Sequence, residues 1–276
     1  MDKIGGEFTI LGSRGFLGSH LLRTLVSRGH SVYTPDNIDY DVFRVEHGNI
    51  FYCIGLTADF RTRPFATIES HVCILNKLLK ETCFKSLTYF SSTRVYHGAD
   101  STTEDAMLRV DPNRNDDLYS LSKLAAEALC LHSGREGIKI LRLSNLVGIR
   151  DDNDLFINQI LHDIVTRRFI TLHSSATSSK DYIWVQDAVD AAITMASSTL
   201  SGCYNLASGH NQTNYNLLAA LRSHFEFELE YTERASEVIY PEIDISKIRG
   251  AISWEPSEFS DYFRDFISQY KINRGL

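Results

Sequence analysis

A glycine-rich turn near the N-terminus limits the folds open to this chain more than any other feature. Residues Phe8 to Leu11 form a short apolar stretch of strand type, and Gly12-Ser-Arg-Gly15-Phe-Leu-Gly18 follows directly. The next segment repeats apolar residues at helical spacing. A strand, a glycine turn and a helix place a pyrophosphate over a helix N-terminus, where free N–H groups and the positive dipole end attract it. Glycines suit the turn because it needs unusual backbone angles and close approach of the phosphate.

Two charged residues bear on which dinucleotide this turn binds. Residues Ser31 to Pro35 are predicted to form a second strand, and Asp36 follows at its end. An acidic residue there accepts hydrogen bonds from the adenosine ribose and repels a 2′-phosphate, which favours NAD. Arg14, inside the glycine turn, can instead bind a 2′-phosphate. The sequence therefore favours NAD and leaves NADP open.

The pattern of strands and helices continues through the first two hundred residues. Further strands are predicted at 50–54, 86–90, 138–143 and 203–207, and helices at 64–82, 116–134 and 187–196. The strand at 86–90 leads into Ser91-Ser92-Thr93, and the strand at 138–143 leads into Ser144 and Asn145. Strands that alternate with helices indicate an α/β fold with a parallel, doubly wound sheet. Such sheets bind ligands at the carboxyl ends of their strands.

Tyr119 and Lys123 form the main catalytic candidate in the predicted helix at 116–134. Residues four apart share a helix face, so the phenol and the ammonium can point into one site. An ordinary tyrosine has a pKa of about 10, and a cation at ~4 Å can stabilise its phenolate enough to make it a base near neutral pH. By itself this spacing also fits a solvated surface pair.

Composition excludes several other classes of function. The net charge of −7 argues against a nucleic-acid partner or an anionic membrane. The longest apolar run, Ile50 to Leu56, is far too short to span a membrane, and the N-terminus lacks a signal-peptide pattern. The five cysteines are an odd number without C-x-x-C spacing, and most are expected to be buried thiols, neither disulfides nor metal ligands. A reducing, cytoplasmic location is expected.

Taken together, eight elements in order resemble the extended short-chain dehydrogenase/reductase family of nucleotide-sugar epimerases and dehydratases. They are GSRGFLG, Asp36, YFSSTRVYHG, the Tyr119–Lys123 pair, LRLSNLVG, KDYIWVQD, GCYNLASG and DISKIRGAISWEP. The resemblance implies a Rossmann domain at 1–148 plus 181–209, and a smaller C-terminal substrate cap at 149–180 plus 210–276. It also implies a homodimer that pairs the helices at 64–82 and 116–134.

The resemblance also implies roles for single residues. The catalytic residues would be Ser92, Tyr119 as the base, and Lys123, which would also bind the nicotinamide ribose. The NAD-binding residues would be Gly12, Arg14, Gly15, Phe16, Leu17, Gly18, Asp36, Gly55, Tyr119 and Lys123. The residues that bind the nucleotide-sugar substrate would be Ser92, Thr93, Arg94, Asn145 and Lys180.

Four departures from the family pattern limit what is carried over. Only residues 37–49 separate Asp36 from the next strand, so the adenine side is expected to be abbreviated. Thr93-Arg94 stands where 4,6-dehydratases have Asp-Glu, which disfavours that reaction because no paired carboxylate can protonate a leaving hydroxyl. His71 replaces the usual asparagine and is interpreted as a packed or hydrogen-bonded structural residue. Lys180 replaces an arginine and binds phosphate only as a point charge.

The sequence is compatible with three functions. The leading hypothesis is an NAD-dependent epimerase or related oxidoreductase that acts on a nucleotide-linked sugar through transient hydride transfer. An NADPH-dependent ketosugar reductase is the second, because of Arg14 and the short chain. A non-catalytic dinucleotide-binding protein is the third, and the presence of Ser92, Tyr119 and Lys123 argues against it.

Overall fold

The core of the molecule is a six-stranded sheet in which every pairing is parallel. The computed structural model describes residues 6–38, 42–57, 59–149 and 155–275. The strand order is β2-β1-β3-β4-β5-β9. The strands are β1 (Phe8–Leu11), β2 (Val32–Tyr33), β3 (His47–Tyr52), β4 (Phe84–Ser92), β5 (Ile138–Leu143) and β9 (Gly202–Leu206).

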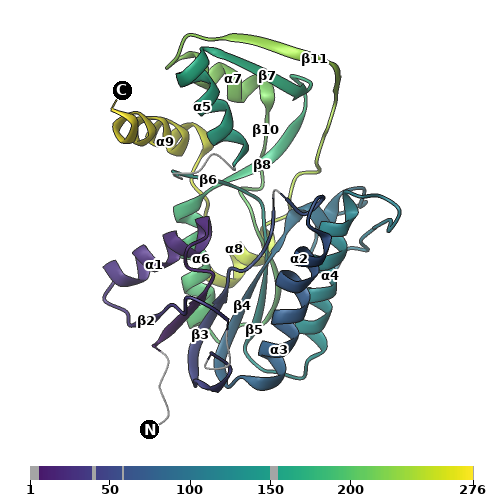
Figure 1. The fold of residues 1–276 in the computed structure, drawn as a ribbon, viewed down its shortest axis with the longest axis vertical. Coiled ribbons are helices and arrows are strands. Elements are labelled where there is room, and N and C mark those ends of the chain that lie inside the picture. Colours follow the sequence, from purple (N-terminus) through teal and green to yellow (C-terminus); the bar gives the residue numbers. More distant parts are fainter. Residues whose placement is uncertain (1–5, 39–41, 58, 150–154, 276) are drawn as a thin grey trace.

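Helices cover both faces of this sheet (Figure 1). One face carries α1 (Phe16–Ser27) and α6 (Val185–Ser197), which pack on each other and share one apolar core. The other face carries a second core under α3 (Ile74–Glu81) and α4 (Asp117–His132). The predicted helix at 64–82 consists of α2 (Pro64–Ile68), the π-helical turn η2 (Glu69–Cys73) and α3. The doubly wound α/β prediction is confirmed.

The sheet ends at β2, which is shorter than the predicted strand at 31–35. Only Val32 and Tyr33 pair, with Phe8 and Thr9 of β1. Pro35 has no N–H to extend the ladder. Between Asp36 and β3 the described residues form only the short 3-10 turn η1 (Val42–Arg44). The expected abbreviation of the adenine side is therefore present in the fold.

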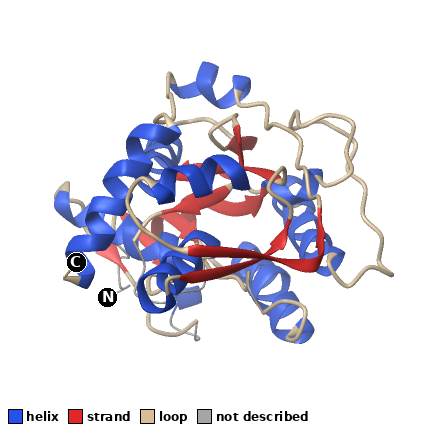
Figure 2. Cartoon of the chain, turned by 90° about the horizontal axis from the view of Figure 1, so that it is seen from above, coloured by secondary structure: helices blue, strands red, loops and turns tan. Residues whose placement is uncertain are grey.

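A second, smaller part contains two small sheets (Figure 2). One sheet joins β6 (Asn145–Val147), β8 (Ser179–Trp184) and β10 (Asn211–Thr213), and the other joins β7 (Phe169–Ser174) and β11 (Glu228–Ser236). A separate apolar core forms under α5 (Phe156–Arg167), α7 (Asn214–Arg222) and α9 (Phe259–Arg274). This part is therefore built from residues that precede α6 in the sequence and residues that follow β9.

One segment packs differently from the expected division between domain and cap. The helix α8 (Ser246–Ile252) falls in the range expected for the cap. Ile243, Ile245 and Ile248 pack instead into the core shared by α1 and α6. The helix α8 contacts both β9 and α6, and spacing along the chain does not reveal these contacts.

The five cysteines are all unpaired thiols, but they are less uniformly buried than expected. Cys130 and Cys203 are buried, and Cys53 is half-buried. Cys73 and Cys83 are exposed, so fewer of the thiols are buried than the predicted majority. Within the described ranges, no helix combines the length and the apolar character needed to cross a membrane.

Candidate active site

The glycine turn between β1 and α1 is built for close backbone approach. Gly12 has φ of +91°, and a Cβ there would lie 2.9 Å from the backbone carbon and oxygen of Cys53. A Cβ on Gly18 would lie only 2.3 Å from the oxygen of Gly12. Gly15 precedes α1 in an extended conformation, no side chain caps the helix, and its first turn carries no acid. This N-terminus therefore fits the pyrophosphate of a dinucleotide.

Four further residues predicted to bind the dinucleotide lie in or near the turn, two of them packed against the core and two exposed. Phe16 is buried and Leu17 packs partly buried against the same core, so they fix the start of α1. Arg14 and Asp36 are both exposed, and Arg14 Nη2 donates a hydrogen bond to the backbone oxygen of Asp36 at 3.0 Å. The two residues that favour different dinucleotides thus meet through the backbone of Asp36.

Ser92 and Arg94 lie where β4 ends, as predicted for the ligand edge of the sheet. Ser92 Oγ accepts a hydrogen bond from the backbone N–H of Arg94 at 3.2 Å and caps the 3-10 turn η3 (Thr93–Tyr96). Thr93 is buried in this turn. The guanidinium carbon of Arg94 lies 5.9 Å from the ring centroid of Tyr119. The structure therefore brings Ser92, Arg94 and Tyr119 together.

Tyr119 lies in the first turn of α4 and is only 7% exposed. Burial raises its pKa, while a hydrogen bond with Ser92 and the positive charge of Arg94 act to lower it. The sequence argument assigned this electrostatic role to Lys123. Lys123 Nζ lies 5.8 Å from the Tyr119 ring centroid, about as far as Arg94, and donates to the backbone oxygen of Phe90 at 2.9 Å. In this structure the charge that lowers the pKa of Tyr119 is that of Arg94, and a contribution from Lys123 stays a prediction.

Lys123 is held in a narrow buried space. It is 5% exposed, and burial lowers its pKa to about 8, opposed by the charge of Glu127. A Cβ on Gly55 would lie 3.7 Å from Lys123 Nζ and 3.0 Å from His71 Nε2. Because Gly55 has no Cβ, there is room beside it for the side chains of Lys123 and His71.

His71 links the loop after β3 to α4. Its Nε2 accepts from the backbone N–H of Leu56 at 3.2 Å. Its Nδ1 lies 2.8 Å from Ser122 Oγ, which itself donates to the oxygen of Tyr119, so Nδ1 carries the proton. Burial, with the charge of Lys123, lowers the pKa of His71 to about 3. These contacts match the hydrogen-bonded structural role expected for His71.

The second part of the molecule contributes Lys180 and Asn145. Lys180 Nζ lies 4.3 Å above the ring of Phe156, and burial together with the charge of Arg94 lowers its pKa. Asn145 Nδ2 donates to the backbone oxygen of Asp181 at 2.8 Å. The amide of Asn145 thus joins β6 to β8.

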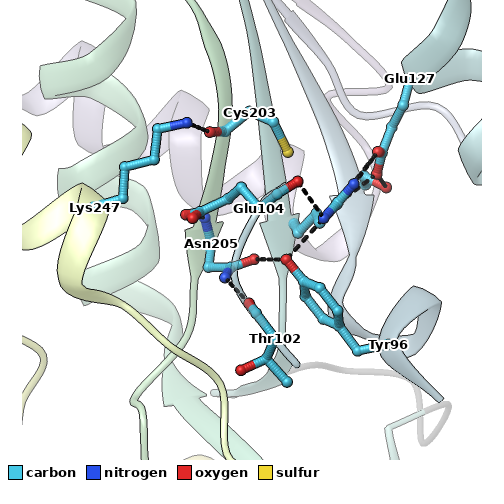
Figure 3. Close-up of polar contacts among 9 residues, drawn as sticks. Tyr96, Thr102, Glu104, Glu127, Cys203, Asn205 and Lys247 are labelled. Atoms are coloured by element: carbon cyan, nitrogen blue, oxygen red, sulfur yellow. Dashed lines mark hydrogen bonds and ion pairs between the residues drawn. The ribbon is translucent and has the colours of Figure 1, made fainter. Parts of the chain in front are cut away.

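A buried polar network behind these residues was not anticipated. The carboxylate of Glu127 pairs with Arg142 at 2.7 Å and also accepts from Ser91 Oγ. Arg142 in turn donates to Tyr96 Oη at 2.8 Å, and Tyr96 donates to Asn205 Oδ1 at 2.7 Å, as Figure 3 shows for the last pair. Two signals pointed to it: an acid four residues after Lys123, and an arginine inside an apolar strand.

Asn205 extends this network to distant segments. Its amide donates to the backbone oxygens of Thr102 and Asp244, both at 2.7 Å. Its backbone N–H donates to Glu104 Oε1 at 2.7 Å (Figure 3). The strand end that bears Ser92 is thereby connected to the segment before α8.

The chain is similar to known proteins over most of its length. The model of the NAD dependent epimerase/dehydratase family matches residues 8–207. UDP-glucuronic acid decarboxylase 1 of Danio rerio is 25% identical over 92% of this chain and 70% of its own length. UDP-glucose 4-epimerase of Lactobacillus helveticus is 22% identical over 90% of this chain and 91% of its own.

A solved structure with the same fold is MoeE5 in complex with UDP-glucose and NAD. It superposes with a TM-score of 0.82 over 96% of this chain and 99% of its own, at 17% sequence identity. At this identity the likeness establishes the fold.

Proposed function

The chain belongs to the NAD dependent epimerase/dehydratase family, and from that premise we propose that it epimerises a nucleotide-linked sugar through transient hydride transfer, with Tyr119 as the base. One observation carries the proposal. Ser92, Tyr119 and Lys123 meet at the carboxyl edge of the sheet, with Gly55 against Lys123 and the glycine turn at the same edge.

The residues present fit the cofactor of the family. Gly12, Gly15 and Gly18 provide the backbone surface for the pyrophosphate. Asp36 would bind the adenosine ribose, and Lys123 the nicotinamide ribose. When bound, NAD accepts a hydride from a sugar carbon and returns it, so that no net oxidation results.

The side chains then have to position and deprotonate one sugar hydroxyl. Ser92 Oγ would hydrogen-bond the reacting oxygen, and Tyr119 would take the proton of the hydroxyl as the C–H and O–H bonds break and C=O forms. Tyr119 returns that proton when the hydroxyl is re-formed on the opposite face. Ser92 and Arg94 favour the phenolate against the effect of burial. Lys180, Thr93 and Asn145 would line the substrate side.

Epimerisation is preferred over dehydration because of the residues that follow Ser92. Elimination of water requires an acid beside the leaving hydroxyl. Thr93 and Arg94 occupy the positions of the paired acids in the 4,6-dehydratases, and neither can serve as that acid at neutral pH.

The second candidate is an NADPH-dependent ketosugar reductase. The contact between Arg14 and the backbone of Asp36 favours it, because a guanidinium at that place can meet a 2′-phosphate. Affinities for NADH and NADPH separate the two candidates. A clear preference for NADPH would favour the reductase.

We also propose a homodimer in a reducing, cytoplasmic environment. Support for the dimer is a groove of ≈ 840 Å³ on the face of α3 and α4, lined by Val72, Leu79, Ala125 and Leu129 among others. The five unpaired thiols suit a reducing compartment. Size-exclusion chromatography with light scattering tests the dimer, and a monomer at micromolar concentration contradicts it.

The reaction is tested with a panel of nucleotide sugars and 4-keto sugars, incubated with NAD or NADPH and followed by NMR. With the substrate that turns over, Tyr119→Phe should reduce kcat by about 10²–10⁴, the usual contribution of a general base. NAD affinity should stay within a few-fold. Activity above about a tenth of the wild type removes Tyr119 as the base.

A further inference from the structure

The geometry around Arg94 points to the kind of sugar that the site takes. Resting on the function proposed above, we propose that Arg94 binds a carboxylate of the substrate and selects a nucleotide-linked uronic acid over the neutral sugar.

Arg94 is oriented by aromatic rings at the reacting end of the site. Its guanidinium carbon lies 5.1 Å from the ring centroid of Phe60 and 5.9 Å from that of Tyr119. The two rings are themselves 5.4 Å apart, and Phe60 is 1% exposed. Cations within about 6 Å of a ring face are held by its quadrupole. The guanidinium is therefore held beside the proposed base.

The guanidinium of Arg94 forms no direct ion pair with a described carboxylate. Nearby Asp116 is itself paired with Arg61, and that pairing together with the charge of Arg94 lowers the pKa of its carboxyl. The charge of Arg94 nevertheless lowers the pKa values of Tyr119 and Lys180. Two cations that repel each other in one partly buried site favour the entry of anions.

A nucleotide-linked uronic acid brings two anionic groups to this site. Its diphosphate suits Lys180, which can bind phosphate as a point charge. Its carboxylate suits Arg94, whose guanidinium matches a carboxylate with two parallel hydrogen bonds. In a hexuronic acid the carboxylate is bonded to C5, so it lies close to the ring hydroxyls that Tyr119 could deprotonate. A neutral sugar would leave Arg94 desolvated without a partner. Such a loss discriminates between ligands more strongly than the presence or absence of an apolar group.

The experiment compares binding of UDP-glucuronic acid, UDP-glucose and UDP to the NAD-bound protein by titration calorimetry. No turnover is required, so the result does not depend on the role of Tyr119. The wild type should bind UDP-glucuronic acid about 10- to 100-fold more tightly than UDP-glucose, the size of a charge-assisted bidentate contact. In Arg94→Gln this ratio should fall to about threefold or less, with UDP-glucose and UDP unchanged.

Two further variants separate a change in net charge from the loss of the guanidinium of Arg94. Arg63→Gln makes the same change in net charge at an exposed ion pair with Asp59 and should keep the wild-type ratio. Arg94→Lys keeps the charge without the planar fork and should keep only part of it. Equal losses for all three ligands in Arg94→Gln would assign Arg94 to the diphosphate and overturn the proposal. A wild-type ratio below about threefold overturns it without any variant.

Discussion

The glycine turn and the reacting end of the site, formed by Ser92, Arg94 and Tyr119, lie at the same edge of the sheet. The first is formed by main-chain atoms and the second by side chains. The turn is backbone: Gly12 and Gly18 matter because a Cβ would collide with main-chain atoms. The reacting end is side chain: Ser92, Arg94 and Tyr119 come from two segments and are held by rings and hydrogen bonds.

This difference shows where each half of the site can vary. A backbone cradle recognises phosphates through N–H groups that every residue carries, so it tolerates few substitutions and keeps one ligand class. A side-chain site changes its charge with one replacement. Arg94 and Lys180 carry positive charge here without an ion pair to a described carboxylate. We therefore expect substrate choice to depend on the second half.

The largest expected effect concerns the buried network behind the side-chain half. Glu127→Gln leaves Arg142 buried without its counter-charge, so we expect unfolding free energy to fall by about 3–5 kcal/mol in urea titrations. Glu255→Gln, at the exposed Arg249–Glu255 pair, is the control and should cost less than about 1 kcal/mol. Equal losses would mean that the buried pair contributes no more to stability than an exposed one.

The backbone half is tested by adding one methyl group. In Gly18→Ala the new Cβ collides with the oxygen of Gly12, and overpacking of this kind costs about 1–3 kcal/mol. If this cost falls on binding, NAD affinity drops about 5- to 150-fold. Gly250→Ala, in α8 with open space around it, should instead stabilise the protein by roughly 0.5–1 kcal/mol. Unchanged NAD affinity in Gly18→Ala would contradict the cradle.

A smaller effect should distinguish a structural from a reactive histidine. The folded state holds His71 neutral with a pKa of about 3, against 6.5 in the unfolded chain. As the pH falls below 6.5 only the unfolded chain takes up this proton, so stability falls with acid, by about 2 kcal/mol at pH 5. His71→Asn lacks this component. Urea titrations at pH 7 and pH 5 should therefore show a smaller acid loss in the variant, and equal losses would refute the buried neutral state.

The smallest expected effect concerns Arg14, a charged side chain at the outer end of the backbone half. Arg14 is exposed, so Arg14→Ala should weaken NADPH binding only about two- to fivefold, the scale of a solvated charge pair. NADH affinity should change by less than about twofold. Fluorescence titration of both nucleotides measures this, and an equal loss for both would place Arg14 on the pyrophosphate.

Local patterns were sufficient where one segment builds the feature. The strands at 8–11 and 138–143 have the predicted bounds, while β4 extends two residues beyond the predicted 86–90 at each end, so that Ser92 is its last residue. The predictions differ from the structure where contacts with a distant segment determine the bounds or the packing of an element. The predicted strand at 31–35 keeps only Val32–Tyr33, since it pairs on one side only. Residues 243–248 join the sheet domain because Asn205 and the core under α6 hold them there.

The site divides in the same way. Tyr119 and Lys123 could be paired from spacing, because four residues make one turn of any helix. Spacing did not show that Lys123 donates to Phe90 while Arg94 affects the pKa of Tyr119. Those contacts cross between segments far apart in the chain, and burial, which sets the pKa of both residues, is a property of the packed molecule.

The sequence by itself determined that this chain forms a parallel α/β sheet with a dinucleotide turn, because periodicity and glycine placement act over short distances. Only the tertiary structure decided which charges meet at the reacting end. It places Arg94 over Phe60 and Tyr119 and brings Lys180 within reach of the charge of Arg94. The physical reason is that electrostatic interactions depend on distance and burial in space, which the order of residues does not specify.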